Sequence, residues 1–171
     1  MFIFIYAFNN FLNTKLNFIP QPMTLKRKIY DHYTQLVDDK LRLLQEVLAD
    51  LKESGSNETK STAGDKHETA LAMLQIEQAN VGAQLQDVLE KKSALEKINP
   101  ALSSSKIVNG SLVKTDKGYL FMSMALGKAT IDGNSVIALS PQSPLGQKLL
   151  GLSTGDVAAI NNNKYVIEAI E

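Results

Sequence analysis

The sequence has no cysteine and no tryptophan, and aromatic residues make up only 6% of its 171 residues. Without cysteine, disulfides and thiolate metal sites are both excluded, which suits a cytoplasmic location. So few aromatic residues argue against a large aromatic-lined ligand pocket. Neither charge is in excess, because 18 basic residues balance 18 acidic ones. A nucleic-acid binder that acts through bulk charge would be more basic.

A long apolar run is missing as well. The apolar stretch 2–8 stops at Asn9 and Asn10 and is far shorter than the roughly 20 residues of a membrane-spanning helix. It has neither the basic segment before it nor the small-residue cleavage site after it that mark a secretory signal. Residues 1–22 are therefore read either as a signal or anchor or as an over-extended start before Met23. We leave them out of the fold and expect no membrane partner.

Two helical patterns follow, each with apolar residues at steps of three and four. The stripe of the first pattern, 23–54, consists of Tyr30, Tyr33, Val37, Leu41, Leu44, Leu48 and Leu51. The stripe of the second consists of Leu71, Leu74, Gln78, Val81, Leu85, Val88, Lys92 and Leu95. The second pattern ends at Asn99-Pro100, because the residue before proline avoids the α region. Together they predict an antiparallel coiled-coil hairpin over residues 23–100.

The register of this hairpin follows from pairing the residues of the two stripes in antiparallel order, with the fold-back centred at Ser61. This pairing places Leu44 opposite Gln78. The same matching predicts a tip near 55–68 and a loop over 55–64. We interpret the polar members of the second stripe, Gln78 and Lys92, as residues that fix the register rather than as a binding feature.

After a polar linker, 101–106, the pattern changes to short strands and turns. Residues 107–171 predict a compact antiparallel β-sheet with one helix, so the fold class is α+β. One strand is expected over 119–126, and turns are expected at 131–134 and 161–163. The helix lies in "SPLGQKLLG", with Ser143 as N-cap, Pro144 at the first helical position and Gly151 just past the end. No glycine spacing of a phosphate-binding loop is present.

The segment "KSTAGDKHETA", 60–70, brings Asp65 and Glu68 to one side of a helical turn. One interpretation is a helix start, with Asp65 as N-cap and Glu68 reaching back to it as in a capping box. The other is half of a Mg²⁺ site, since Mg²⁺ takes one or two protein carboxylates and fills its remaining positions with water and phosphate oxygens. We interpret His67 as solvated, because no second histidine lies nearby.

Two segments of the chain resemble the Gre transcription elongation factors. Gly64, Asp65 and Glu68 match the family's tip motif, Gly-Asp-x-x-Glu, and "SPQSPLGQKLLGLSTGD", 140–156, resembles the family's C-terminal stretch. The resemblance covers about residues 23–171. It implies that the second domain is FKBP-like and docks on bacterial RNA polymerase, while the hairpin enters the secondary channel. The docking residues it implies are Ser143, Pro144, Leu145, Gly151 and Asp156.

For the tip, the resemblance implies that Asp65 and Glu68 deliver a Mg²⁺ ion that helps cleave backtracked RNA. The factor would stimulate the polymerase's own cleavage and act on the RNA 3′ end indirectly, so it would not be an enzyme alone. No cofactor would bind stably, and Mg²⁺ would be shared with the polymerase only in the complex. We expect a monomer.

Two other functions stay open. The family continues its motif with Asn-Ala-Glu, whereas this chain has 69–71 as Thr-Ala-Leu, and a non-catalytic regulator that only occupies the channel is the alternative. A plain coiled-coil interaction protein is a third, disfavoured by the C-terminal resemblance. Prolyl isomerase activity is not expected, because the second domain has only three aromatic residues, too few for a proline pocket: Tyr119, Phe121 and Tyr165.

Overall fold

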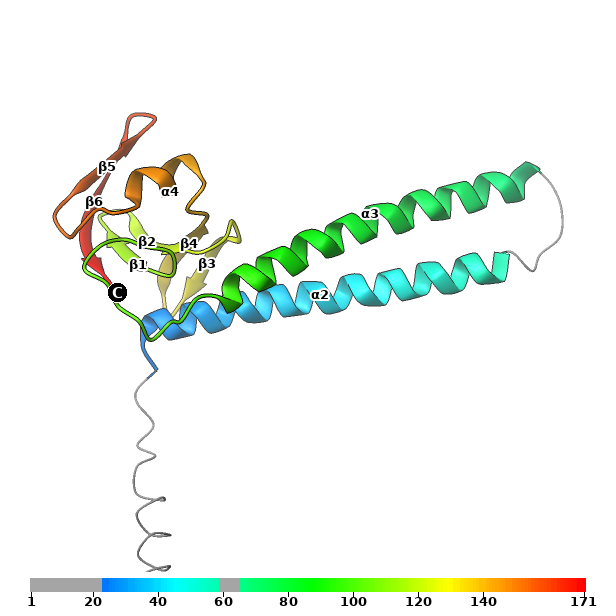
Figure 1. The fold of residues 1–171 in the computed structure, drawn as a ribbon, viewed down its shortest axis with the longest axis horizontal. Coiled ribbons are helices and arrows are strands. Elements are labelled where there is room, and N and C mark those ends of the chain that lie inside the picture. Colours follow the sequence, from blue (N-terminus) through cyan, green and yellow to red (C-terminus); the bar gives the residue numbers. More distant parts are fainter. Residues whose placement is uncertain (1–22, 59–64) are drawn as a thin grey trace, which may run out of the picture.

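The computed structural model describes residues 23–58 and 65–171, and in it a long helical hairpin projects from a small sheet domain (Figure 1). The hairpin consists of α2 (Leu25–Glu58) and α3 (Asp65–Glu96). The sheet domain adds β1 (Leu112–Thr115), β2 (Gly118–Met122), β3 (Gly127–Ile131), β4 (Asn134–Leu139), α4 (Pro144–Leu149), β5 (Val157–Ile160) and β6 (Asn163–Ile170). This confirms the predicted α+β class and its hairpin. The expectations for 1–22 and Gly64 lie outside the described residues.

Helix α2 begins after Thr24, whose hydroxyl accepts a hydrogen bond from the Arg27 amide at 3.2 Å. It runs to Glu58, so the predicted loop over 55–64 is wrong for its first four residues, which are helical. Extending a long helix costs little once it has nucleated, even through serine and a single glycine, Gly55. The helix is on the order of 50 Å long.

The seam between α2 and α3 is apolar, with its polar members paired across it. The Gln78 amide donates to the Leu51 carbonyl oxygen at 3.0 Å, and Lys92 forms an ion pair with Asp38 at 2.6 Å. The hydrogen bond from Lys92 to the Asp38 carboxylate raises the pKa of Lys92. Both polar residues therefore bind the partner helix, in agreement with their interpretation as register-fixing residues. The buried apolar members of the seam are Val37, Leu44, Val81, Val88 and Leu95.

The side-chain contact differs from the predicted pairing: Gln78 donates to Leu51, about two helical turns nearer the tip than Leu44, the residue that the matched stripes place opposite it. Side chains on a helix lean toward its N-terminus. In an antiparallel pair, a side chain of α3 therefore reaches toward the tip, where α2 carries its higher residue numbers. Matching stripes by residue number alone ignores this lean.

The sheet has six strands in the order β3-β4-β2-β1-β6-β5. The predicted antiparallel pairing holds for every neighbouring pair except β2 and β4, which run parallel. The chain reverses twice between these two strands, and β4 inserts beside β2 while β3 lies at the edge. After two reversals β4 runs in the direction of β2, so the pair is necessarily parallel.

Strand β3 was missed, and the strand expected over 119–126 ends at Met122. The signal for β3 was the turn that follows it, where Asp132 and Gly133 both have positive φ, 49° and 77°. Such a two-residue turn joins strands in a hairpin, and it pairs β3 with β4. Two asparagines, Asn161 and Asn162, make the equivalent turn between β5 and β6, in agreement with the turn predicted at 161–163.

The base of the hairpin covers one face of the sheet and α4 covers the other (Figure 1). Tyr33 of α2, only 1% exposed, is central to the first contact. Its hydroxyl donates to the Gly127 carbonyl oxygen at 3.0 Å and lies 3.3 Å from that of Val136, while its ring stacks on Phe121. Burial raises the pKa of this phenol. Hairpin and sheet therefore share one core, which also includes Ile29, Leu112, Ile131, Val136 and Ala138.

Helix α4 has the predicted ends. Ser143 is its N-cap and accepts from the Gly146 amide at 3.0 Å, Pro144 follows in the first turn, and Gly151 lies past the end with a φ of 80°. At Gly146 a Cβ atom would overlap the Ser140 carbonyl oxygen. Only glycine fits this position.

Replacing Tyr33 with Phe removes the hydroxyl that joins the hairpin to β3. We expect the free energy of unfolding to fall by about 1 kcal/mol, the net value of a buried hydrogen bond. Urea denaturation measures it. The control is Tyr30→Phe, because the Tyr30 hydroxyl lies 3.4 Å from its acceptor and should contribute only a few tenths. Equal losses in the two variants would contradict this account of the junction.

Two glycine-to-alanine variants should change stability in opposite directions. Gly146→Ala forces a Cβ against the Ser140 carbonyl and should lower the free energy of unfolding by roughly 1–3 kcal/mol, as overpacking does. Gly82→Ala, inside α3 with open space around the new Cβ, should raise it by roughly 0.5–1 kcal/mol. Thermal unfolding of the pair tests both, and a stabilised Gly146→Ala variant would overturn the first.

Candidate functional site

The two predicted acids lie at the start of α3, the end of that helix farthest from the sheet (Figure 1). Asp65 is the first helical residue, and Glu68, on the same turn, is exposed to solvent. The side chains of Asp65 and His67 are not among those described, so the N-cap and the interpretation of His67 stay predictions. Acidic side chains here also interact favourably with the helix dipole.

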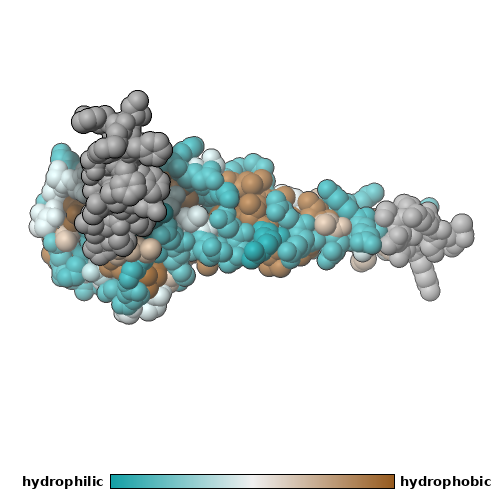
Figure 2. All heavy atoms as spheres, turned by 90° about the horizontal axis from the view of Figure 1, so that it is seen from below, coloured by the Kyte–Doolittle hydropathy of each residue, from teal (hydrophilic) through white to brown (hydrophobic). Residues whose placement is uncertain are grey.

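The hairpin holds this pair at a distance. With 32 residues, α3 separates its first residue from the sheet by on the order of 48 Å. Seen from below, from the α2 side, the shaft is largely hydrophilic with separate hydrophobic patches (Figure 2). The arrangement presents a small acidic group on a long arm, which suits a narrow site on another molecule.

The predicted docking residues form a second cluster around α4, at the opposite end of the molecule from Glu68. Most of them have structural roles. Ser143 caps α4, Gly151 supplies the positive φ after it and donates its amide to the Ile107 carbonyl, and Asp156 accepts from the Ser153 amide at 2.8 Å. Leu145 is half-buried against the core. The motif thus fixes the shape of this segment.

Of the predicted docking residues around α4, Pro144 offers an exposed side chain on the helix itself. A pocket of about 280 Å³ lies between the end of α3 and the segment around α4, and it is lined by residues that the sequence did not single out. Leu150 and Gln142 are exposed at its rim, and the buried hydroxyl of Ser123 lacks a hydrogen-bond partner there. Gln142 and Leu150 lie inside the stretch 140–156, but the sequence analysis did not single them out.

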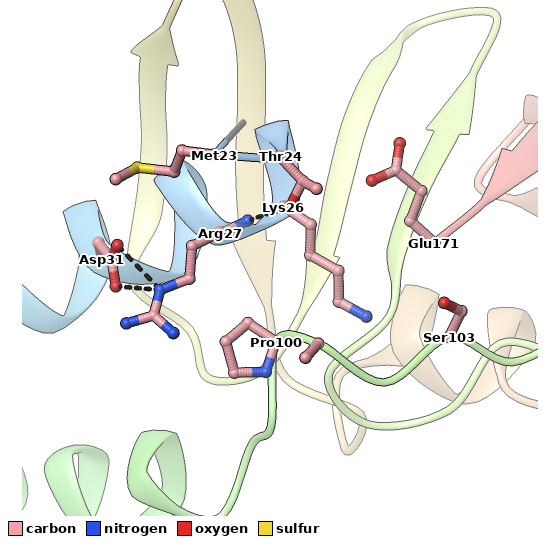
Figure 3. Close-up of a pocket in the computed structure, with 9 residues that line it drawn as sticks. Met23, Thr24, Lys26, Arg27, Asp31, Pro100, Ser103 and Glu171 are labelled. Carbon is pink, nitrogen blue, oxygen red and sulfur yellow. Dashed lines mark hydrogen bonds and ion pairs between the residues drawn. The ribbon is translucent and has the colours of Figure 1, made fainter. Parts of the chain in front are cut away.

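A larger cavity, about 500 Å³, lies at the base of the hairpin between the start of α2 and the segment after α3 (Figure 3). Two of its basic groups have partners: Arg27 binds Asp31 through two hydrogen bonds, and Lys26 donates to the Leu102 carbonyl at 2.5 Å. Lys26 is 4% exposed, and this burial lowers its pKa, against the opposing charge of Glu171. The cavity holds no nucleophile paired with a base, so we assign it to the junction.

Within 23–58 and 65–171, no group of three or more His, Asp or Glu side chains is arranged to hold a metal ion. None of the described helices is both long and apolar enough to cross a membrane.

No family model matches the sequence, and no curated protein matches it. Two solved structures are similar over most of this chain. The crystal structure of GreA factor homolog 1 (Gfh1) protein of Thermus thermophilus has 19% sequence identity and a TM-score of 0.31, covering 83% of this chain and 94% of that one. A structure of the transcription factor Gfh1 has 20% identity and a TM-score of 0.29, covering 88% and 97%. Both identities are below the level at which a likeness of folds extends to function, and both TM-scores are low.

Proposed function

We propose that this chain is a divergent Gre-type transcription factor that binds bacterial RNA polymerase in the cytoplasm. The hairpin of α2 and α3 enters the secondary channel, and the segment around α4 docks on the polymerase. One observation carries the proposal: Glu68, in the motif that resembles the Gre tip, is exposed in the first turn of α3, about 42 Å along the helix from its end at the sheet domain. A long arm with acids at its far end suits delivery into a channel.

At the polymerase, Asp65 and Glu68 would hold one Mg²⁺ ion beside the backtracked RNA. The donor set fits, because Mg²⁺ binds through one or two carboxylates and otherwise keeps water and phosphate oxygens. When bound, the ion supplies Lewis-acid activation of a phosphoryl group. The protein contributes the two carboxylates and their position, so it stimulates the polymerase and is not an enzyme alone.

The alternative is regulation by occupancy, in which the hairpin fills the channel and the acids serve only to begin α3. It is favoured by their place in the first turn, where acidic residues stabilise a helix without any metal. The two functions differ in what the acids contribute, so they predict different results for the same variant.

Asp65→Ala/Glu68→Ala should abolish the shortening of RNA in stalled, backtracked complexes of the cognate polymerase with Mg²⁺, while binding to the polymerase persists. Gel analysis of labelled RNA measures the first, and competition binding measures the second. The matched control is Glu77→Ala, which removes an exposed acid on the same helix away from the tip. This variant should stimulate RNA cleavage as wild type does. If neither wild type nor variant shortens RNA but both bind, occupancy is the function.

Shortening the hairpin tests the reach of the arm independently of its acids. Removing one heptad from each arm, 42–48 and 81–87, keeps the helical phase and retracts the tip by about 10 Å. RNA cleavage should be lost, because the tip no longer reaches the RNA 3′ end, while the α4 segment still binds the polymerase. Normal cleavage by a folded, shortened protein would contradict insertion of the arm.

A further inference from the structure

A second cavity, of about 310 Å³, adjoins the one drawn in Figure 3 and shares Lys26 and Ser103 with it. Its walls are formed by Lys26 of α2 and by the segment 97–111, which joins α3 to β1. Two lysines line the cavity, Lys26 and Lys97, whereas no acidic residue does so within the described parts of the chain. We call it the two-lysine cavity. Its balance of charge favours an anionic ligand.

Lys26 is a buried cation whose partner is a neutral group. It is 4% exposed, and its ammonium group donates to the Leu102 carbonyl oxygen at 2.5 Å. Figure 3 shows this ammonium end pointing to the segment that follows α3. Among residues 23–58 and 65–171 it forms no ion pair, although the charge of Glu171 acts on it from farther away. Burying a charge costs free energy unless the charge is paired, and an ammonium group has three N–H donors, of which one is used here.

The other polar groups of the two-lysine cavity are also available to a ligand. Lys97 is exposed, and its side chain has no hydrogen bond or ion pair with any described residue. The same holds for the side chains of Ser103 and Asn109. Ammonium, hydroxyl and amide groups all donate hydrogen bonds, and lysine binds phosphate as a point charge. Together these groups form a set of donors suited to an oxyanion.

One wall of the cavity is held in place by the fold itself. Gly110 has a φ of 89°, and a Cβ atom there would lie 2.9 Å from the Ile98 side chain, so the backbone packs closely on that residue. The Gly110 amide donates to the Met122 carbonyl oxygen at 2.6 Å, and the Ser111 hydroxyl accepts from the Val108 amide at 3.1 Å. A wall formed in advance loses little conformational entropy when a ligand binds.

We propose that the two-lysine cavity binds the terminal phosphate of a small molecule through Lys26 and Lys97. A phosphate monoester carries about −1.5 to −2 charge near neutral pH and three acceptor oxygens, which matches two cations and several free donors. A carboxylate or a phosphodiester brings only one negative charge. The volume lies near the lower end of the roughly 300–1,000 Å³ of ligand pockets, so the phosphate and few further atoms fit. The site does not depend on the proposed function.

Inorganic phosphate is the first probe, titrated into the full chain at constant ionic strength. The backbone amide NMR signals of residues 97–111 should shift saturably, with a Kd in roughly the millimolar range. The melting temperature should rise with phosphate, because a ligand that binds only the folded chain stabilises it. The absence of a saturable shift in this segment would overturn the proposal.

Lys97→Gln is the decisive variant, because the fold places no partner on this exposed side chain. It should weaken phosphate binding about tenfold or more, the value of a hydrogen bond to a charged group, and leave the melting temperature without phosphate unchanged. The control, Lys52→Gln, removes the same charge from an exposed residue near the far end of α2 and should bind phosphate like wild type. Equal losses in the two variants would indicate an effect of net charge alone and would contradict the site.

Lys26→Gln separates binding of a ligand from the structural role of Lys26. It removes the charge but keeps an N–H donor for the Leu102 carbonyl, so a folded variant should lose phosphate binding. Wild-type affinity in a folded Lys26→Gln protein would show that Lys26 only holds the segment 97–111 against α2. If this variant does not fold, the result for Lys97→Gln decides the proposal.

A comparison of esters identifies the source of the phosphate. Ethyl phosphate, a monoester, should bind at least as tightly as inorganic phosphate, and dimethyl phosphate, a diester with a single charge, should bind about tenfold more weakly. If dimethyl phosphate binds as tightly as ethyl phosphate, the cavity accepts the backbone of a nucleic acid and the assignment to a terminal phosphate is wrong.

Discussion

The attachment of the hairpin to the sheet depends on the contact around Tyr33. Its hydroxyl reaches carbonyl groups of β3 and β4, and its ring lies on Phe121 of β2. A two-helix hairpin buries only one seam, and its distal residues are only partly buried, so it gains rigidity mainly at its base. The shared core, with Tyr33 at its centre, therefore fixes the direction in which an arm about 50 Å long projects.

The two candidate sites are separated by the length of that arm. The α4 segment belongs to the sheet domain, and the acids belong to the start of α3. Because the hairpin base and the sheet share a core, a partner that binds the α4 segment also fixes where the tip points. In the proposed function, docking at one end positions chemistry at the other, which requires rigidity between them and no moving part.

The C-terminal motif illustrates what a recognisable sequence encodes. Ser143, Gly146 and Gly151 are required by a cap, a close backbone approach and a positive φ. The Ser143 side chain is occupied by the cap and the two glycines have none, so these residues offer little surface for a partner to contact. A resemblance carried by such residues reports the shape of the segment, while Pro144 and Leu150 keep exposed side chains.

The sequence by itself determined the local elements: both hairpin helices, the ends of α4, and the turns at 131–134 and 161–163. These follow from periodicity, capping and backbone preference, which act over a few residues. Only the tertiary structure decided which groups of α2 the side chains of Gln78 and Lys92 contact, the parallel pairing of β2 with β4, and the edge strand β3. The lean of side chains and the insertion of one strand beside another depend on partners distant in sequence, and no local pattern records them. The same holds for Tyr33: its spacing assigns it to the helix seam, and only the packing of the sheet against α2 shows that it joins the hairpin to the sheet.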